Sequence, residues 1–226
     1  MGLRVHPPVV AFVQARMSSR RFPGKVLAPF RGQPIIRHVI GAVTGAVESI
    51  PLVVATSIDA SDDPLTAYVE GLGVPVFRGA LADVFRRFRD CLDVFPCDWI
   101  LRISGDSPLL DPRIVKAVVA RGVGPEARVD LVTTIFPRTF PTGQNAELIR
   151  SDAFRAIDMD ALTDDDREHV TPCFYRHPER FAIVNVSSGS PSLAALSFAV
   201  DSPEDLHRLE ASADADVNAL AAALDI

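Results

Sequence analysis

The sequence predicts an α/β fold with a doubly wound, mostly parallel sheet, and two observations predict it. Over the first 135 residues, short apolar runs alternate with stretches in which apolar residues recur at helical spacing. The apolar runs are continuous, as is typical of strands that are buried on both faces. In such a sheet the carboxyl ends of the parallel strands share one edge, so a ligand site is expected there.

The elements of this first part are expected in regular alternation. Strands are predicted at 9–13, 52–56, 74–77, 99–103 and 129–134, and helices at 33–47, 62–71, 80–95 and 112–120. The helix at 80–95 is expected to bury one face with Leu81, Val84, Phe85, Phe88 and Leu92. Ser61 or Asp62 is expected to cap the helix that begins at 62.

After Ile135 the regular alternation stops, and prolines and acidic residues become frequent. Strands are still expected at 181–186 and 196–200, and Pro203 is expected to open a final helix that runs to about Leu224. We expect one domain over residues 1–226, in which 136–190 forms a small excursion from the sheet and 194–226 returns to it.

Composition excludes several classes of protein. The chain of 226 residues carries a formal charge of −6, which argues against non-specific binding of nucleic acid. No apolar run approaches the roughly 20 residues of a membrane span, and no leader is visible at residues 1–8. The three cysteines form no CxxC pair, so free thiols in a reducing compartment are expected. A cytoplasmic protein without membrane or nucleic-acid partners follows.

A basic loop follows the first predicted strand. Residues 14–25 hold three arginines, Lys25 and two serines, but no acidic residue. Positive charge at the ligand-binding edge of an acidic protein favours a site for a triphosphate, although a solvated basic loop is the alternative. The loop is not a Walker A motif, because Val26 follows Lys25, and the chain has no GxGxxG dinucleotide fingerprint.

Two aspartates follow apolar runs and are candidate metal ligands. Asp106 comes after Gly105 at the end of the strand 99–103, and Asp201 comes after 196–200. Mg²⁺ prefers one or two carboxylates together with phosphate oxygens. The alternative is helix capping, for which Asp111 is better placed than Asp106, whereas Asp201 or Ser202 could be an ordinary cap before Pro203.

These segments resemble the cytidylyltransferases, the family of enzymes that make CMP-sialic acid and CMP-3-deoxy-manno-octulosonate, and most of all the branch named after spore coat polysaccharide biosynthesis protein SpsF. The resemblance covers nearly the whole chain in order, through VQARMSSRRFPGKVL (13–27), VFRG (76–79), DV (83–84), RISGDSPL (102–109), REHVTP (167–172) and VDSPEDL (200–206). It implies a GT-A-like nucleotidyltransferase fold, a Mg²⁺ cofactor and CTP as the donor. Analogy with related cytidylyltransferases suggests a homodimer, with 136–190 as a dimerisation or acceptor-binding arm.

The resemblance also implies roles for individual residues. Arg16, Lys25 and Asp106 are the implied catalytic residues, and Asp106 and Asp201 the implied metal ligands. The implied nucleotide-binding residues are Ala15, Arg16, Ser18, Ser19, Arg21, Lys25, Arg78 and Asp83; the implied acceptor-binding residues are Glu147, Arg167 and His169. Ser18 replaces a glycine that is usual in the family, and Asn145 stands where many relatives carry an acid, which leaves the acceptor open.

The expected reaction is transfer of CMP from CTP to a sugar or sugar-acid, with release of pyrophosphate, in the synthesis of surface polysaccharide precursors. Other nucleotides or a phosphonate acceptor remain alternatives, as does a non-catalytic nucleotide-binding protein. A glycosyltransferase is disfavoured, because its usual Asp-x-Asp motif is absent after Asp106. His169 is a candidate general base, but a lone histidine is more often structural or substrate-binding.

Overall fold

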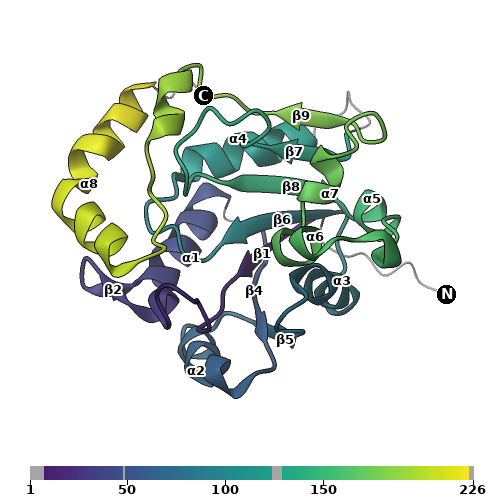
Figure 1. The fold of residues 1–226 in the computed structure, drawn as a ribbon, viewed down its shortest axis with the longest axis horizontal. Coiled ribbons are helices and arrows are strands. Elements are labelled where there is room, and N and C mark those ends of the chain that lie inside the picture. Colours follow the sequence, from purple (N-terminus) through teal and green to yellow (C-terminus); the bar gives the residue numbers. More distant parts are fainter. Residues whose placement is uncertain (1–7, 48, 124–128, 224–226) are drawn as a thin grey trace.

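The computed structural model describes residues 8–47, 49–123 and 129–223, and it is built around one large sheet (Figure 1). Seven strands lie in the order β5-β4-β1-β6-β8-β7-β9, and β8 alone runs opposite to the others. The strands are β1 (Val9–Gln14), β4 (Leu52–Ser57), β5 (Val76–Gly79), β6 (Trp99–Ser104), β7 (Leu131–Thr133), β8 (Ala146–Arg150) and β9 (Ile183–Asn185). The predicted α/β fold with a mostly parallel sheet is confirmed.

Helices cover both faces of this sheet (Figure 1). The longer ones are α1 (Ile35–Ala46), α2 (Asp63–Gly71), α3 (Val84–Val94), α4 (Pro112–Gly122) and α8 (Pro203–Ala223), and the shorter ones are α5 (Ser151–Arg155), α6 (Asp164–His169) and α7 (Pro172–Tyr175). A separate two-stranded ribbon joins β2 (Pro29–Phe30) to β3 (Gln33–Pro34). Among the described helices, none combines the length and the apolar character that a bilayer crossing needs.

The strand β1 shows why continuous apolar runs form the centre of the sheet. Val9, Ala11 and Val13 point into a hydrophobic cluster that includes the buried residues of α1 and α4. Val10 and Phe12 point into a second cluster, with the apolar residues of α3, α5 and α7. Because successive side chains of a strand point to opposite faces, burial on both faces requires every position to be apolar.

Residues 136–190 are not wholly an excursion, because they supply β8 and β9 to the sheet. The strand β8 was not predicted from the sequence. It lies between β6 and β7 and is antiparallel to both, and it carries the buried Glu147 in place of a continuous apolar run. The part that leaves the sheet is 151–182, which contains α5, α6 and α7; α6 packs against α3.

The prediction of a strand at 196–200 is wrong, and the described residues of this last segment, 194–223, add no strand to the sheet. The segment instead runs beside the loop before β8, where the Phe198 N–H donates to the Thr142 carbonyl at 2.6 Å. Gly143 makes this approach possible: it has a φ of +92°, and a Cβ there would lie 2.6 Å from the Ala199 nitrogen. The approach carries the chain towards Asp106, whose carbonyl accepts the Val200 N–H at 2.9 Å.

Smaller differences concern helix ends. The helix predicted at 80–95 begins only at Val84, because the Asp83 side chain caps it by accepting the Arg86 N–H. Asp62 is the N-cap residue of α2, one of the two predicted, but its side chain makes no capping bond: the buried carboxylate accepts N–H groups of Met17 and Ser57 instead. The expected absence of a leader at residues 1–8 and the end of the last helix at Leu224 involve residues outside the described ranges.

Candidate active site

The site is centred on the ammonium group of Lys25, which joins three segments far apart in the sequence. Its Nζ donates to Asp106 Oδ2 at 2.7 Å, to Asp201 Oδ1 at 2.9 Å and to the Val200 carbonyl at 2.8 Å. Arg21 Nη2 lies 2.9 Å from the other oxygen of Asp201. Two of the sequence-predicted loop cations, Lys25 and Arg21, therefore meet the two candidate metal ligands at one place.

The protonated form of Lys25 is favoured by its surroundings. Burial lowers its pKa, but the charges and hydrogen bonds of Asp106 and Asp201 outweigh burial and raise the pKa above its ordinary value. The three donors of the ammonium are all used, so the side chain is held in one position.

Local structure fixes both carboxylates at this edge. Gly105 lets the chain turn tightly after β6: a Cβ there would lie 2.9 Å from both the Ala15 Cβ and the Gln14 carbonyl oxygen. Asp106 is not a helix cap, because Asp111 caps α4 by accepting the Arg113 N–H at 2.8 Å. At the start of α8, Ser202 and Asp205 cap each other's backbone, which leaves the Asp201 side chain to Lys25 and Arg21.

The donor set limits how a metal could be held. Within the described residues no group of three or more His, Cys, Asp or Glu side chains could hold a metal ion. Asp106 and Asp201 form a pair that the Lys25 ammonium bridges, and their side chains are 26% and 41% exposed. Two accessible carboxylates match the coordination of Mg²⁺ by protein and phosphate oxygens together.

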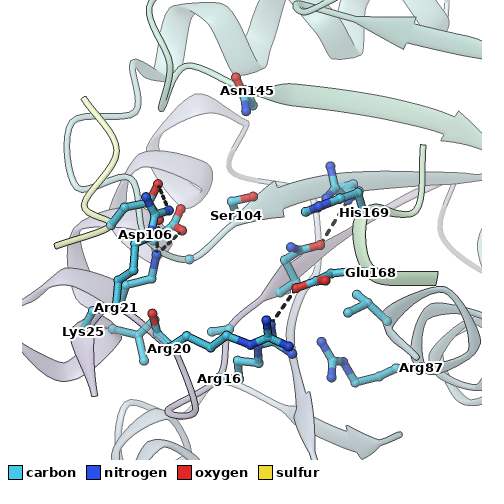
Figure 2. Close-up of a pocket in the computed structure, with 18 of the residues that line it drawn as sticks. Arg16, Arg20, Arg21, Lys25, Arg87, Ser104, Asp106, Asn145, Glu168 and His169 are labelled. Carbon is cyan, nitrogen blue, oxygen red and sulfur yellow. Dashed lines mark hydrogen bonds and ion pairs between the residues drawn. The ribbon is translucent and has the colours of Figure 1, made fainter. Parts of the chain in front are cut away.

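A cavity of about 500 Å³ extends from this cluster along the carboxyl ends of β1 and β6 (Figure 2). Its lining residues are Gln14, Ala15, Arg16, Ser19, Arg20, Arg21, Lys25, Val26, Val84, Arg87, Arg102, Ser104, Gly105, Asp106, Ile135, Asn145, Glu168, His169, Thr171 and Asp201. They include six cationic side chains against three carboxylates, a formal charge of +3 in a chain of charge −6. The pocket therefore suits a polyanion.

At the other end of the pocket, the loop after β1 meets α6. Arg16 Nη2 donates to Glu168 Oε1 at 3.0 Å, although the two residues are 152 positions apart. His169 also lines the pocket and lies 3.8 Å from Asp165 on the same helix. Figure 2 shows Glu168, His169 and Arg87 on one side of the pocket, with Lys25, Arg21 and Asp106 on the other.

A buried chain of hydrogen bonds forms the floor beneath the pocket. Arg102 Nε donates to Gln14 Oε1 at 3.1 Å, and its Nη1 is paired with Glu147. Tyr175 donates to the other oxygen of Glu147 and shares a bond of 2.8 Å with Thr133. Burial and then the Glu147 charge raise the pKa of Tyr175. Of the residues in this hydrogen-bonded network, only Gln14 and Arg102 line the pocket. The network therefore fixes the positions of these two side chains in the pocket wall.

The sequence-predicted site residues are not all in one place. Of the implied nucleotide-binding residues, Ala15, Arg16, Ser19, Arg21 and Lys25 line the pocket, whereas Ser18, Arg78 and Asp83 do not. The implied metal ligands Asp106 and Asp201 line it. Among the implied acceptor-binding residues, His169 lines it, and Glu147 and Arg167 do not.

The residues outside the pocket are held by other contacts. Arg78 donates to the carbonyls of Ser57 and Asp59, both at 2.8 Å, and pairs with Asp63 at 2.7 Å. Asp83 caps α3 and pairs with Arg167 at 2.7 Å, which ties α3 to α6. These contacts position the walls of the site, and Glu147 lies in the floor described above.

Several lining residues had no individual role predicted from the sequence: Arg20, Arg87, Arg102, Ser104, Glu168 and Thr171. Two of them carried a signal in the sequence. Arg87 lies three positions after Val84 on the helix, next to the predicted apolar face, where a cation is out of place. Arg102 likewise interrupts an apolar strand run. Cationic residues at core positions can thus indicate a site.

The three cysteines, by contrast, take no part in the pocket. All three are buried and free, as predicted from their number and spacing. Burial raises the pKa of the Cys97 thiol to about 11 and that of Cys173 to about 12, so neither is a reactive thiolate at neutral pH.

The fold and this site define a nucleotidyltransferase: a cationic pocket with a carboxylate pair at the strand ends of a mostly parallel sheet. The family model for cytidylyltransferases matches residues 10–195, and the chain belongs to that family.

Relatives and a solved structure agree with this assignment. The chain is 29% identical to spore coat polysaccharide biosynthesis protein SpsF of Bacillus subtilis over 181 residues, covering 77% of this chain and 73% of that protein. It is 34% identical over 117 residues to an 8-amino-3,8-dideoxy-manno-octulosonate cytidylyltransferase of Shewanella baltica, 50% of this chain and 46% of that one. The structure of a cytidylyltransferase from Leptospira borgpetersenii matches this one with a TM-score of 0.88 and 26% sequence identity. The match covers 96% of this chain and 93% of that one.

Proposed function

We propose that this chain transfers CMP from CTP to a sugar or sugar-acid in a Mg²⁺-dependent reaction that releases pyrophosphate. The observation that carries the proposal is the meeting of Lys25 with Asp106 and Asp201 at the edge of a pocket with an excess of positive charge. A non-catalytic binding protein would have no use for a carboxylate pair beside an anionic ligand. The membership of the cytidylyltransferase family supports the donor.

In the proposed reaction an oxygen of the acceptor attacks the α-phosphorus of CTP. The new bond joins that oxygen to the phosphorus, and the bond from the phosphorus to the bridging oxygen of the β-phosphate breaks. Pyrophosphate leaves with the electron pair, and the acceptor loses its proton. Catalysis of such a step consists mainly of positioning and electrostatic stabilisation.

The residues of this chain divide these tasks by position. Lys25, Arg21 and Arg16 neutralise the triphosphate and the leaving pyrophosphate, with Ser19 in the same loop. His169 is the imidazole that lines the pocket, and it is the candidate to accept the proton of the acceptor.

Asp106 and Asp201 are the residues that would hold Mg²⁺, and the ion would supply positive charge to the phosphate oxygens. Their accessible oxygens suit it, because a bound nucleotide would complete the coordination that two carboxylates leave open. Lys25 now holds both carboxylates, so the triphosphate has to draw its ammonium away before the carboxylates are free.

The acceptor and the setting are the finer parts of the proposal. The name of the Shewanella relative supports a sugar acid of the octulosonate type as the acceptor. The SpsF relative supports a role in making precursors of a surface polysaccharide. We further propose that the protein acts in the cytoplasm, as one domain and as a homodimer that uses part of 136–190 as its arm.

Pyrophosphate release tests the reaction directly. CTP, UTP, GTP and ATP are each incubated with MgCl₂ and a panel of sugars and sugar acids, using the wild-type protein, Asp106→Asn and the control Asp90→Asn, whose half-exposed side chain does not line the pocket. Release with CTP and one acceptor class, lost in Asp106→Asn and kept in Asp90→Asn, supports the proposal. Release with another nucleotide alone would identify a different donor, and unchanged release by Asp106→Asn would contradict the assigned role.

A further inference from the structure

Arg87 on α3 is a buried cation that the reaction described above does not use. Its residue is only 2% exposed, yet it lines the pocket. Nη1 donates to the Ala80 carbonyl at 2.8 Å, whereas the buried Nε has no hydrogen-bond partner. Among the described residues, no carboxylate oxygen lies within 4.0 Å of its guanidinium nitrogens. Arg87 thus carries a desolvated charge that is paired with no carboxylate directly, and Asp62 and Asp83 act on it only from a longer distance.

Such an arrangement is unfavourable for the free protein. A buried charge is normally paired or hydrogen-bonded throughout, because desolvation is not otherwise offset. Burial and then the nearby charge of Arg16 lower the pKa of Arg87 to about 10, so the group is still protonated at neutral pH. The charge therefore persists in the pocket wall.

Packing alone does not explain the residue. Its Cγ packs against Gly79, where an added Cβ would lie 2.9 Å away, so the glycine makes room for the long side chain. Residues beside Arg87 on α3, such as Phe88 and Val84, are apolar and belong to the second hydrophobic cluster, on the face of the sheet that Val10 and Phe12 line. An apolar side chain of similar length would fill this position without stranding a charge.

The charges of the pocket are distributed unevenly. Lys25 and Arg21 are balanced by the two aspartates and Arg16 is paired with Glu168, whereas Arg87 is paired with no carboxylate of the pocket. Figure 2 shows the Arg87 guanidinium directed towards Arg16, at the end of the pocket away from Lys25. One unpaired positive charge of the pocket, that of Arg87, therefore lies at this end.

We infer that Arg87 is a substrate-binding residue, which together with Arg16 receives an anionic oxygen group of a substrate at the pocket end opposite Lys25. The inference rests on the proposed function, in which a triphosphate and the carboxylate of a sugar acid are both present. Either source supplies the same chemistry: a charged oxygen that accepts from the guanidinium and neutralises it.

The experiment compares wild type with Arg87→Met and with the control Arg86→Met, which removes an exposed cation from the same helix that does not line the pocket. The first measurement is the melting temperature with and without inorganic phosphate, at constant ionic strength. Without phosphate, Arg87→Met is expected to melt at the same temperature as wild type or higher. Phosphate is expected to raise the melting temperature of wild type and Arg86→Met clearly more than that of Arg87→Met.

Two further arms identify the source of the anionic group. Calorimetric titration with CTP and with uncharged cytidine, both with Mg²⁺, tests the nucleotide; the KM for the sugar acid in pyrophosphate release tests the acceptor. Loss of about 10-fold to 100-fold in CTP affinity in Arg87→Met, with cytidine binding unchanged, assigns the group to a phosphate. Unchanged CTP affinity with a similar rise in KM assigns it to the acceptor.

The outcomes separate this inference from the proposed function. A lower melting temperature of Arg87→Met together with unchanged phosphate response, CTP affinity and KM would overturn it and show a structural role. A wild-type protein that responds to phosphate through Arg87 but does not bind CTP would support Arg87 and contradict the proposed donor. A wild-type protein that responds to neither ligand would overturn both.

Discussion

The substitution Lys25→Met removes the ammonium from the centre of the site and keeps a side chain of similar length. It deletes three hydrogen bonds, two of them to the carboxylates of Asp106 and Asp201. The chain has only one other lysine, Lys116, which is exposed on α4 and provides a matched control. The two variants therefore differ in which ammonium is lost and not in charge.

The expected loss of stability follows from the exposure of the partners. Removal of one member of a fully buried ion pair typically costs about 3–5 kcal/mol, because the other charge is left unpaired in the interior. Here the side chains of Asp106 and Asp201 are 26% and 41% exposed, and Arg21 still pairs with Asp201. Hydration of the exposed oxygens reduces the cost, so we expect about 1–2 kcal/mol for Lys25→Met and close to zero for Lys116→Met.

Urea denaturation with and without MgCl₂, at matched ionic strength, measures both the loss and its cause. In Lys25→Met the two carboxylates are no longer held by an ammonium, so Mg²⁺ is expected to stabilise this variant more than wild type. A second signature is pH. Because the pKa of Lys25 is raised above 10.5, its contribution to stability is present below that value and is lost as the pH rises through the folded-state pKa.

Two results would refute this reasoning. If Lys25→Met were as stable as wild type, the ammonium would not be holding the two aspartates. If Mg²⁺ stabilised Lys25→Met, wild type and Lys116→Met to the same extent, the aspartates would not be the place where the cation acts.

Three further substitutions test other parts of the site. Tyr175→Phe removes a donor from the buried Glu147 and is expected to lower the free energy of unfolding in urea by about 1–3 kcal/mol. Glu168→Gln breaks an exposed ion pair, so its free energy of unfolding is expected to change by less than about 1 kcal/mol. The same variant is expected to bind CTP more tightly in calorimetry, because Arg16 is released. Gly105→Ala places a methyl group 2.9 Å from backbone and is expected to cost about 1–3 kcal/mol of stability and to lower turnover.

Each of these has a control and a contrary outcome. Tyr68→Phe, the control for Tyr175→Phe, should leave the free energy of unfolding nearly unchanged. An equal loss of stability in both tyrosine variants would show that the hydrogen bond from Tyr175 to Glu147 does not stabilise the fold. Asp164→Asn on α6 should not alter CTP affinity, and weaker CTP binding by Glu168→Gln would show that the carboxylate helps the ligand. A Cβ at Gly45 meets no atom within 4 Å, so Gly45→Ala should be tolerated, and similar damage from both glycine changes would contradict the close approach at Gly105.

The first half of the fold could be predicted because burial on both faces leaves a clear pattern. Strands such as β1 and β4 are continuous apolar runs, and the helices between them are amphipathic. The strand β8 lacked this pattern, because it uses the buried Glu147, which Arg102 and Tyr175 satisfy through long-range contacts. Those contacts depend on the completed fold, and no local signal reports them.

The false strand at 196–200 has a similar cause. Its apolar side chains are needed because Phe198 and Val200 are buried, but burial does not specify pairing in a sheet. What positions the segment is a close approach to the loop at Gly143, which is a contact between distant parts of the chain. Apolar runs therefore predicted burial correctly here and the hydrogen-bonding pattern wrongly.

For the site, chain order and residue chemistry predicted which groups gather at the strand ends. The basic loop, Asp106 and Asp201 do meet around Lys25. Position alone could not tell whether a polar side chain faces the pocket or a neighbouring element: Arg78 turns to the carbonyl of Ser57 instead. The direction in which a side chain points depends on the hydrogen-bond partners within its reach, and the packing of the elements determines which partners those are.

We propose that the cationic pocket binds CTP together with Mg²⁺. Melting temperatures of the wild-type protein with CTP, UTP, GTP, ATP and dTTP, each with and without MgCl₂, measure this binding. A ligand that binds only the folded state stabilises it by about 2.7 kcal/mol at 100 times its Kd. We expect a clear rise in melting temperature with CTP and MgCl₂ and a much smaller rise with every other combination. No rise with any nucleotide, or an equal rise with all of them irrespective of MgCl₂, would contradict it.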